Sequence, residues 1–334
     1  MNWSQMRASD SQCFAEVFDI HRNSTHDGPG IRTTVFLSGC PIRCRWCHNP
    51  EGRQGCGGVW WLGQNCIRCM RCIEACEEHA LTAVEDGVVI DRSLCTGCQA
   101  CAQACPSRAM QPLGIRRELS ELLAEIELDR TWYEASGGGV TLSGGEPCNQ
   151  PEFAQEFFVR CRQRGLNTAL DTCGVAPPQT FARVVENADL ILFDLKHSDE
   201  SIHRELTGAG LATIHDNLRE SARRARRGEL KLWVRTPLIP RATAEPAVLD
   251  AIGRFLRDEL DGALERWELC AFNPSCSGKY RRLSMAWDYS GVGLQTEAET
   301  SALLAVARAA CGRSDLVHLQ GIRRAPTLHP ETHR

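Results

Sequence analysis

Residues 33–47 read TTVFLSGCPIRCRWC, a short apolar run that leads through a Ser-Gly pair into a loop with three cysteines. Cys40, Cys44 and Cys47 have the spacing CxxxCxxC, with the aromatic Trp46 directly before the last cysteine. Three thiolates from one loop can hold three irons of a cubane cluster and leave the fourth iron open, much as catalytic zinc sites keep one open position. We therefore expect a [4Fe-4S] cluster here, with a zinc site or chance spacing as the alternative.

An open iron can be chelated by the amino and carboxylate groups of S-adenosylmethionine. One electron from the cluster can then cleave the sulfonium and release a 5′-deoxyadenosyl radical. In such chemistry the cofactors do the difficult step, while the protein positions them and excludes water. The loop therefore predicts a radical S-adenosylmethionine enzyme, an oxidoreductase.

The pattern of an apolar run followed by small or charged polar residues recurs along the chain. Short continuous apolar runs are typical of strands that are buried on both faces. The runs are residues 33–37, 139–142, 168–170, 190–193, 230–234 and 267–271. Helical patterns lie between them, with Leu119, Leu122, Leu123 and Ile126 on one face of the first. Strand–helix alternation predicts a parallel sheet with right-handed crossovers.

Six strand–helix units favour an α/β fold with a partial (β/α)6 TIM-like barrel over a closed barrel of eight strands. The carboxyl ends of parallel strands carry the site in such folds. The polar residues that follow the runs, among them Asp171 and Asp194, are therefore candidate site residues.

Eight further cysteines form two groups with the same spacing, CxxCxxCxxxC, offset by 29 residues. The similarity continues past the cysteines, because residues 80–81 (AL) align with residues 109–110 (AM). Such self-similarity indicates an internal duplication. We expect a small α+β ferredoxin-like domain over residues 52–113, inserted between the first two barrel strands. Residues 1–51 would carry the N-terminal segment, the first strand and the cluster loop, and residues 114–334 the rest of the barrel.

The spacing of these two groups is that of bacterial ferredoxins, in which the fourth cysteine of each run ligates the other cluster. Crossed ligation predicts one [4Fe-4S] cluster on Cys66, Cys69, Cys72 and Cys105, and a second on Cys95, Cys98, Cys101 and Cys76. Pro106 follows the second run as the motif requires, whereas Glu77 follows the first. Two zinc sites are the alternative. The expected role is electron delivery toward the first cluster.

Composition excludes several classes of function. The chain has 334 residues, 19 cysteines and a formal net charge of −4, so neither nucleic acid nor an anionic membrane is an expected partner. The N-terminus has no apolar signal-peptide core, and no run of about twenty apolar residues is present. Clustered cysteines in a long chain more often bind metal than form disulfides. We expect a cytoplasmic protein, and a monomer.

Several further motifs, taken in order, make the chain resemble a known family. They are residues 26–33 (HDGPGIRT), 39–41 (GCP), 46–51 (WCHNPE), 136–141 (SGGGVT), 143–147 (SGGEP), 171–174 (DTCG), 194–196 (DLK) and 279–280 (KY). The sequence resembles the glycyl-radical-enzyme activating enzymes, the organic radical-activating family of the radical S-adenosylmethionine superfamily. The resemblance covers nearly the whole chain. It implies abstraction of a hydrogen atom from one glycine of a partner glycyl radical enzyme.

The resemblance also implies roles for individual residues. Gly144, Gly145 and Glu146 would lie beside the methionyl amino group, and Trp46, Cys47 and His48 beside the cofactor. Asp194 and Lys196 would approach the methionyl carboxylate and the ribose. Asp171 and Thr172 would contribute to an adjacent monovalent cation site, and Asp27 would face the glycine of the partner. A flavodoxin or ferredoxin is the implied electron donor.

Two observations bear on these implied roles. Residues i and i+2 of a strand face the same way, so Asp194 and Lys196 should both point into the barrel while Leu195 points out. A buried pair of opposite charges needs a ligand or a structural purpose. Asn273 stands where many relatives carry a histidine that contacts S-adenosylmethionine, so that contact is the weakest part of the resemblance.

Two other functions are possible on these motifs. A radical S-adenosylmethionine enzyme could act on a small molecule and use the extra clusters as auxiliaries; the DGPGIRT stretch and the lack of a large C-terminal substrate domain disfavour it. A plain electron-transfer ferredoxin fused to an inert barrel is disfavoured by the intact three-cysteine loop. Nothing in the sequence identifies the partner among lyases of choline, diols, sulfonates, hydroxyproline or aryl acetates.

Overall fold

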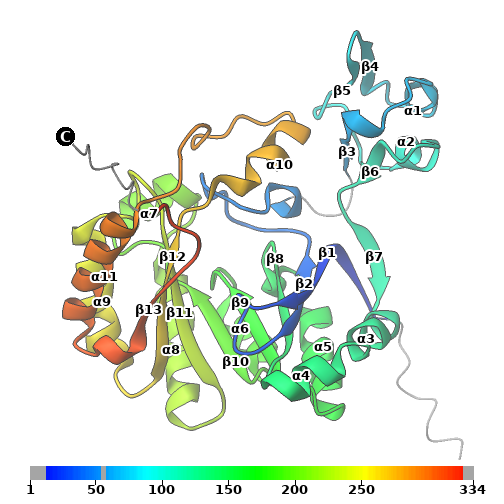
Figure 1. Cartoon of the computed structure of the whole chain (residues 1–334). Helices are drawn as coiled ribbons and strands as arrows, with labels where there is room; N and C mark the ends of the chain where they lie inside the picture. The colour runs from blue at the N-terminus through cyan, green and yellow to red at the C-terminus, as the bar shows by residue number, and fades with distance from the viewer. Residues whose placement is uncertain (1–12, 54–57, 326–334) are drawn as a thin grey trace, which may run out of the picture.

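The computed structural model describes residues 13–53 and 58–325, and its main feature is a curved nine-stranded sheet with helices along its outer face (Figure 1). Seven strands run parallel as neighbours. They are β2 (Arg32–Leu37), β8 (Gly139–Gly144), β9 (Thr168–Thr172), β10 (Leu190–Asp194), β11 (Lys231–Leu238), β12 (Leu264–Ala271) and β13 (Val317–Gln320). In the described residues β13 ends the sheet on one side, so the barrel is open, as predicted.

The sheet contains three strands that the sequence reading did not predict. β1 (Phe14–Ser24) pairs antiparallel with β2, and β7 (Ile115–Glu118) pairs antiparallel with β1. β7 is the edge strand and β1 lies next to it, and both expose many side chains, so neither has the continuous apolar run of a buried strand. β13 has only four residues, VHLQ, and adds a seventh parallel strand to the six predicted ones.

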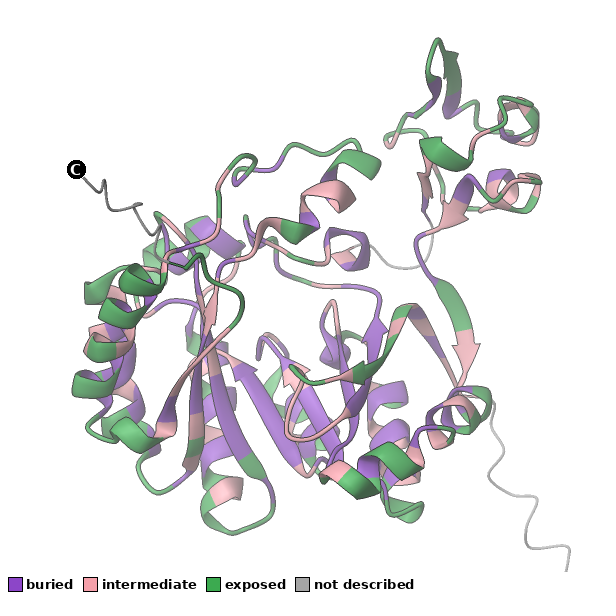
Figure 2. Ribbon diagram, viewed as in Figure 1, coloured by how far each residue is buried: buried purple, intermediate pink, exposed green. Residues whose placement is uncertain are grey.

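The helices of the barrel lie on the outer face of the sheet and bury one apolar stripe each (Figures 1 and 2). They are α3 (Leu119–Glu127), α4 (Arg130–Ser136), α5 (Pro151–Gln163), α6 (Pro178–Val185), α7 (Glu200–Thr207), α8 (Ala212–Arg226), α9 (Pro246–Leu260) and α11 (Glu297–Cys311). All four apolar residues predicted to share one face of α3 are buried. A strand–helix alternation with an open, mostly parallel sheet confirms the predicted fold class.

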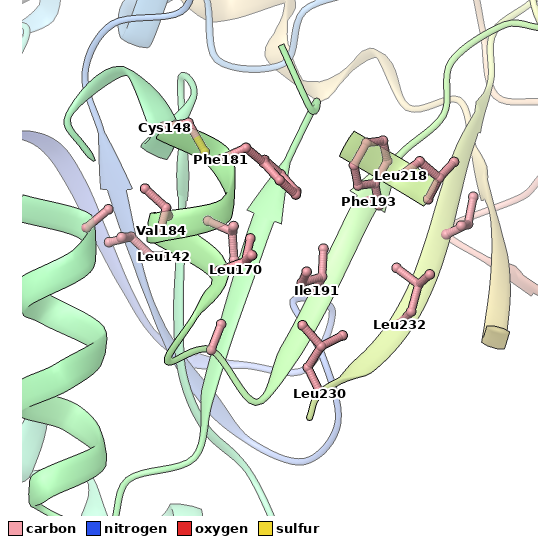
Figure 3. Close-up of a cluster of buried hydrophobic side chains, with 14 of the residues drawn as sticks. Leu142, Cys148, Leu170, Phe181, Val184, Ile191, Phe193, Leu218, Leu230 and Leu232 are labelled. Carbon is pink, nitrogen blue, oxygen red and sulfur yellow. The ribbon is translucent and has the colours of Figure 1, made fainter. Parts of the chain in front are cut away.

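One hydrophobic core joins this sheet to its helices. Leu142, Leu170, Ile191 and Leu232 come from four neighbouring strands and point to the same side, toward side chains of α6 and α8 (Figure 3). The opposite face of the sheet, at the carboxyl ends of the strands, is therefore left for polar side chains. No helix within the described residues is long and apolar enough to cross a membrane.

The segment from β3 to β6, which lies between β2 and β8 in the chain, forms a separate small unit, which we call the module (Figure 1). Its elements are β3 (Val59–Trp61), α1 (Arg71–Glu74), β4 (Leu81–Val84), β5 (Gly87–Ile90), α2 (Ala100–Gln103) and β6 (Met110–Pro112). β3 pairs with β6 and β4 with β5, and the module has a hydrophobic cluster of its own.

The backbone of the module repeats with the offset of the cysteine groups. Left-handed residues at positions 68, 70 and 79 recur at positions 97, 99 and 108, in each case 29 residues later. The short helix α10 (Ser277–Arg282) lies between the module and the barrel, and the Arg282 guanidinium stands 5.4 Å from the centre of the Trp60 ring. Five single turns of 3-10 helix complete the elements of the described residues: η1 (Pro50–Arg53), η2 (Gly63–Asn65), η3 (Pro147–Asn149), η4 (Pro274–Cys276) and η5 (Ser314–Leu316).

Candidate active site

A cavity of about 390 Å³ lies at the carboxyl ends of the parallel strands. It is lined by residues of six of these strands, of the loops that follow them and of the loop before β2. Of the residues predicted for the site, the cavity is lined by Asp27, Cys40, Cys44, Trp46, Cys47, His48, Gly144, Gly145, Asp171, Asp194 and Lys196. Residues far apart in sequence thus meet in one place, at the end of the sheet that the strand pattern indicated.

The three cysteines of the loop after β2 share this cavity, and the loop is held from several sides. The Arg43 amide donates to the Thr207 carbonyl at 2.6 Å, and the Arg45 amide to the Leu206 carbonyl at 3.1 Å. The Tyr280 hydroxyl donates to the Cys47 carbonyl at 2.9 Å. The loop is therefore fixed by α7 and α10 and not by its own turns alone.

The thiols themselves suit an iron–sulfur cluster. All cysteines among the described residues are free, and no three metal-binding side chains there converge as a site for a single ion would need. Burial raises the pKa of the Cys44 thiol to about 12 and also raises the pKa of Cys47, where Arg53 acts in the opposite direction. Thiols must lose their protons to bind metal, so loading this loop would release protons.

Asp194 and Lys196 form an ion pair inside the cavity, as their i, i+2 spacing predicted. Lys196 is 7% exposed, and Leu195 between them belongs to the core on the helix side. Burial opposes the charge on Lys196, but its partners, the Asp194 carboxylate foremost, outweigh burial and raise its pKa. The pair therefore presents a positive and a negative group side by side to whatever fills the cavity.

Asp171 lies next to this pair on β9. It accepts a hydrogen bond from the Ser143 hydroxyl at 2.8 Å, and its carboxylate stands 3.4 Å from the Arg235 guanidinium. Burial raises the pKa of Asp171 to about 7, against the lowering effect of Arg235, with the negative charges of Asp194 and Asp27 adding to the rise. Asp171 therefore changes charge near neutral pH.

Arg235 is a site residue that the sequence reading missed. It follows the apolar run of β11 and pairs in register with Asp194 of β10, so it reaches the cavity from the next strand. Its guanidinium also approaches the buried Glu268 at 3.7 Å. A charged residue at the end of a buried strand is the signal that pointed to Asp171 and Asp194, and it could have pointed to Arg235.

Three predicted site residues do not line the cavity. Glu146 is 1% exposed, and its carboxylate accepts from the Thr172 hydroxyl at 2.8 Å and from the amides of Cys148 and Cys173 at 3.0 and 2.8 Å. Its side chain thereby ties the end of β8 to the end of β9. Thr172 is committed to the same network.

Asn273 is the third of these residues. Its side-chain oxygen accepts from the Ser275 amide at 2.9 Å and so begins η4. A hydrogen bond between the His48 ring and the Asn273 backbone links this residue to the site through its main chain. The structure thus gives the Asn273 side chain a local capping role.

The loop before β2 brings Asp27 to the cavity. The Asp27 carboxylate accepts from the hydroxyls of Ser24 at 2.5 Å and Thr34 at 2.7 Å. Beneath the loop, the buried Arg32 donates to the Thr141 hydroxyl at 2.7 Å and to the Val140 carbonyl at 2.6 Å. Burial lowers the pKa of Arg32 to about 10, so the guanidinium stays charged at neutral pH.

Two further cysteines line the cavity, and the sequence analysis assigned neither of them a role. Cys173, the residue after Thr172, is buried and hydrogen-bonded to the Cys40 side chain. Cys270 lies at the end of β12. Cys148, which follows the end of β8, does not line the cavity, and Cys56 lies outside the described residues.

The cysteines of the module line two small cavities of about 10 and 20 Å³. The first is lined by Cys66, Cys69, Cys72 and Cys105, and the second by Cys76, Cys95, Cys98 and Cys101. These are the two sets that crossed ligation predicts. Each set brings four thiols around one small space, a donor set that suits an iron–sulfur cluster.

Comparison with known families finds two matching profiles. Residues 65–109 match the 4Fe-4S dicluster domain, and residues 92–250 match the radical SAM superfamily. The second match begins inside the module and ends in the first turns of α9, so it leaves out Cys40, Cys44 and Cys47.

Several characterised proteins are similar over most of the chain. The isethionate sulfite-lyase activating enzyme of Oleidesulfovibrio alaskensis is 42% identical over 236 residues, which cover 69% of this chain and 76% of that protein. The choline trimethylamine-lyase activating enzyme of the same organism is 35% identical over 82% of this chain and 88% of its own length. The trans-4-hydroxy-L-proline dehydratase activating enzyme of Clostridioides difficile is 40% identical over 61% and 68%, respectively.

Solved structures overlap more loosely. A domain of a pyruvate-formate lyase-activating enzyme from Bacteroides vulgatus has a TM-score of 0.44 at 25% identity, covering 55% of this chain and 99% of that domain. A radical SAM methyltransferase from Sphaerobacter thermophilus has a TM-score of 0.49 at 13% identity, covering 91% of this chain and 76% of the other.

Proposed function

Because the chain belongs to the glycyl-radical-enzyme activating enzymes of the radical S-adenosylmethionine superfamily, we propose that it abstracts a hydrogen atom from one glycine of a partner glycyl radical enzyme. The observation that carries the proposal is the single cavity shared by the three-cysteine loop, the Asp194–Lys196 pair and Asp27. A cluster loop, a polar cradle and a loop facing outward are the parts that such a reaction needs.

In this proposal Cys40, Cys44 and Cys47 hold the [4Fe-4S] cluster, and S-adenosylmethionine fills the rest of the cavity. When bound, these two groups supply a one-electron cleavage of the sulfonium and hence the organic radical that takes the hydrogen atom. Gly144 and Gly145 let the end of β8 approach β2 and the start of the cluster loop closely, because a Cβ at Gly144 would lie 2.3 Å from the Leu37 amide nitrogen and one at Gly145 would lie 2.3 Å from the Gly39 carbonyl oxygen.

The charged residues of the cavity position the cofactor. Lys196 is a donor without an acceptor role, so it suits the methionyl carboxylate, and Asp194 suits the ribose hydroxyls. Asp171, with Ser143 and Arg235 as partners, completes the polar floor and is our candidate ligand for a monovalent cation. Glu146 and Thr172 act on the site indirectly, because their hydrogen bond holds the ends of β8 and β9 together.

Asp27 serves the protein substrate. Its carboxylate lines the cavity while its loop is held by Ser24, Thr34 and the buried Arg32. A fixed acceptor at this place can receive a backbone amide of the partner beside its glycine. The partner would then reach the radical without admitting water.

The module, which we place at residues 52–113 between the segments 1–51 and 114–334, would hold two further [4Fe-4S] clusters. Its cavities have the four-thiol lining that each would need. These clusters would pass electrons from a flavodoxin or ferredoxin toward the first cluster. Isethionate sulfite-lyase is the first partner to test, since three relatives at 39–42% identity are named as its activating enzymes.

Electron paramagnetic resonance tests this function. The protein is reconstituted anaerobically, reduced, and mixed with S-adenosylmethionine and, in turn, isethionate sulfite-lyase, choline trimethylamine-lyase and hydroxyproline dehydratase. We expect a glycine-centred doublet with at least one of them. Turnover of a small molecule with no doublet from any partner would instead support a radical enzyme that acts on small molecules.

A further inference from the structure

The two cysteine-lined cavities of the module differ in the charge around them. Arg68 lines the cavity of Cys66, Cys69, Cys72 and Cys105, which we call the arginine cavity, and Arg71 and Arg108 are chain neighbours of residues that line it. Glu78 lines the cavity of Cys76, Cys95, Cys98 and Cys101, which we call the glutamate cavity, and Glu77 lies between Cys76 and Glu78 in the chain. The exposed charges at the two ends of the duplicated unit thus differ in sign, whereas the partly buried Arg92, which faces the thiols of Cys95 and Cys101, donates to the Val59 carbonyl.

The crossing of the cysteines produces this polarity. Arg68 and Arg71 lie within the first cysteine run, whereas Arg108 follows Cys105, which the fold brings into the same cavity. In the same way Glu77 and Glu78 follow Cys76, which the fold brings to the cysteines of the second run. Charges that are mixed along the sequence are therefore sorted by the fold.

The three arginines are exposed and carry no internal partner. Within residues 13–53 and 58–325, none of them takes part in an ion pair. The arginines at the end of α8 and just after it differ, since Arg223 and Arg224 are bound to Glu220 and Arg227 to Glu229. The positive charge of the arginine cavity is thus available to a second molecule.

Arg68 adopts a backbone conformation that residues with a side chain disfavour. Its φ of 57° lies in the left-handed region, and the equivalent residue of the second unit is Gly97, with a φ of 77°. Glycine adopts this conformation at no steric cost, whereas a residue with a Cβ is strained there. The turn therefore does not require an arginine at position 68, and the guanidinium it carries lies at the rim of the arginine cavity.

The arginine cavity also has an apolar centre that opens to solvent. Ile67 is 64% exposed, and Cys69 beside it is exposed as well. The glutamate cavity lies toward the connections to the barrel, because Val59 lines it and the Gln99 side chain donates to the Gly114 carbonyl at 3.0 Å. Weak electron-transfer complexes use small interfaces of this kind, with charge complementarity around a redox centre.

We propose that the arginine cavity is the docking surface for an acidic one-electron donor protein, with Ile67 and Cys69 at its centre and Arg68, Arg71 and Arg108 at its rim. Glu77 and Glu78 repel the same partner from the glutamate cavity. One electron leaves the donor and reduces the cluster held by Cys66, Cys69, Cys72 and Cys105, and no bond or proton moves. This inference rests on the proposed function only in that the module relays electrons inward.

The test uses cluster-loaded full-length protein and flavodoxin. Oxidised flavodoxin serves to measure the dissociation constant by calorimetry. Reduced flavodoxin serves to measure the electron-transfer rate by stopped flow, in which the flavin absorbance reports the loss of one electron. In the triple variant Arg68→Glu, Arg71→Glu, Arg108→Glu we expect affinity and rate to fall at least about tenfold at low ionic strength. The difference should shrink in about 0.5 M salt, because salt screens exposed charges.

Two further variants separate a local effect of the arginine cavity from a general effect of net charge or of module stability. Arg162→Glu, Arg223→Glu, Arg227→Glu makes the same change of net charge on exposed residues of α5 and α8, and should leave affinity and rate within about twofold. Arg68→Gly removes one charge while relieving the left-handed strain, so it should weaken docking without weakening the module. Equal losses in both triple variants, or no loss in either, would overturn the proposal.

Failure of the docking surface and failure of the proposed function are separable. With dithionite as the reductant, no protein donor is needed, so the arginine-cavity variant should form as much glycyl radical as the wild type. Loss of glycyl-radical-enzyme binding together with intact flavodoxin binding would assign the surface to that enzyme and refute the donor proposal. A wild type that makes no glycyl radical with dithionite would refute the function and leave the docking result standing.

Discussion

At the scale of single residues, Cys44 is the cysteine of the three-cysteine loop that the protein buries most completely, with its pKa raised to about 12 by that burial. A thiol in such a place is inert unless a metal takes its proton. Cys40 and Cys47 lie nearer to solvent on the same cavity. The loop therefore acts as one donor set that fails when one member is removed.

Cys44→Ala tests this donor set. We expect S-adenosylmethionine cleavage to be lost while the iron of the module stays bound, because the module has separate ligands. Liquid chromatography of 5′-deoxyadenosine, with iron and sulfide determination, measures both. Cys161→Ala, which removes a buried thiol from α5 far from any cavity, is the matched control and should keep cleavage. Retained cleavage in Cys44→Ala would contradict the cluster assignment.

Asp171 leads to a prediction about pH. Its pKa is raised to about 7, so the folded protein binds this proton more tightly than the unfolded chain. The stabilisation that follows is present at low pH and is lost as pH rises through 7. Asp171→Asn cannot ionise, so its melting temperature relative to wild type should rise between pH 6 and 8.5, in cluster-loaded protein without S-adenosylmethionine. A difference that stays constant over this range would show that Asp171 does not titrate there.

The residue types at this site were readable from sequence, but their partners were not. Asp194 and Lys196 could be paired in advance, since strand alternation fixes their direction. The sequence could not show that the Glu146 side chain is turned away from the cofactor. Two of its partners, Thr172 and the Cys173 amide, lie 26 or more residues away, and the third, the Cys148 amide, depends on the turn after β8. The register between neighbouring strands decides which side chains at a strand end contact the next strand.

At the scale of elements, β2 carries both the cluster loop at its end and the Asp27 loop at its beginning. Arg32, the first residue of β2, anchors the second of these loops. Its guanidinium donates to Thr141, Val140 and Asn167 and to the Pro29 carbonyl of the loop itself. A single buried side chain thus sets the position of the Asp27 loop relative to β8.

Arg32→Lys should therefore destabilise the barrel. Lysine cannot serve these acceptors in their planar arrangement, so buried acceptors lose their donors, at a cost of about 2–3 kcal/mol. Urea unfolding followed by near-ultraviolet circular dichroism measures the change. Arg162→Lys on the exposed face of α5 should change stability by less than about 0.5 kcal/mol. Equal stabilities of the two variants would contradict the anchoring role of Arg32.

Six of the strands were predicted, and the three that were missed share a physical reason. Buried parallel strands have continuous apolar runs, and such runs are visible without knowledge of the fold. β1 and the edge strand β7 have mixed, partly exposed sequences that form strands by pairing with each other and with β2, and β13 is too short to leave a periodic signal. Their sequences become strands only because a sheet edge is already present.

At the scale of the whole molecule, the module and the barrel are joined by the chain on either side of the insertion and by α10. The duplication that was read from cysteine spacing recurs in the backbone, where left-handed residues repeat with the same offset. The charge polarity of its two cavities was not readable from spacing alone, because it depends on which cysteines share a cavity.

Crossed ligation predicts which cysteine variants act together. Cys76→Ala and Cys95→Ala should each remove the same cluster, about four irons per chain, and the double variant should lose no more than either alone. Cys76→Ala combined with Cys66→Ala should lose both clusters. Iron and sulfide analysis with Mössbauer spectroscopy measures the losses. Additive losses for Cys76 and Cys95 would show that the ligation is not crossed.

The central claim is that the hydrogen atom comes from a glycine of a partner protein. A glycyl radical enzyme that carries deuterated glycine is mixed with this protein, S-adenosylmethionine and a reductant, and the 5′-deoxyadenosine is analysed by mass spectrometry. We predict that one deuterium appears in 5′-deoxyadenosine in proportion to the glycyl radical formed. Unlabelled 5′-deoxyadenosine, formed at the same rate with and without the partner, would contradict the account.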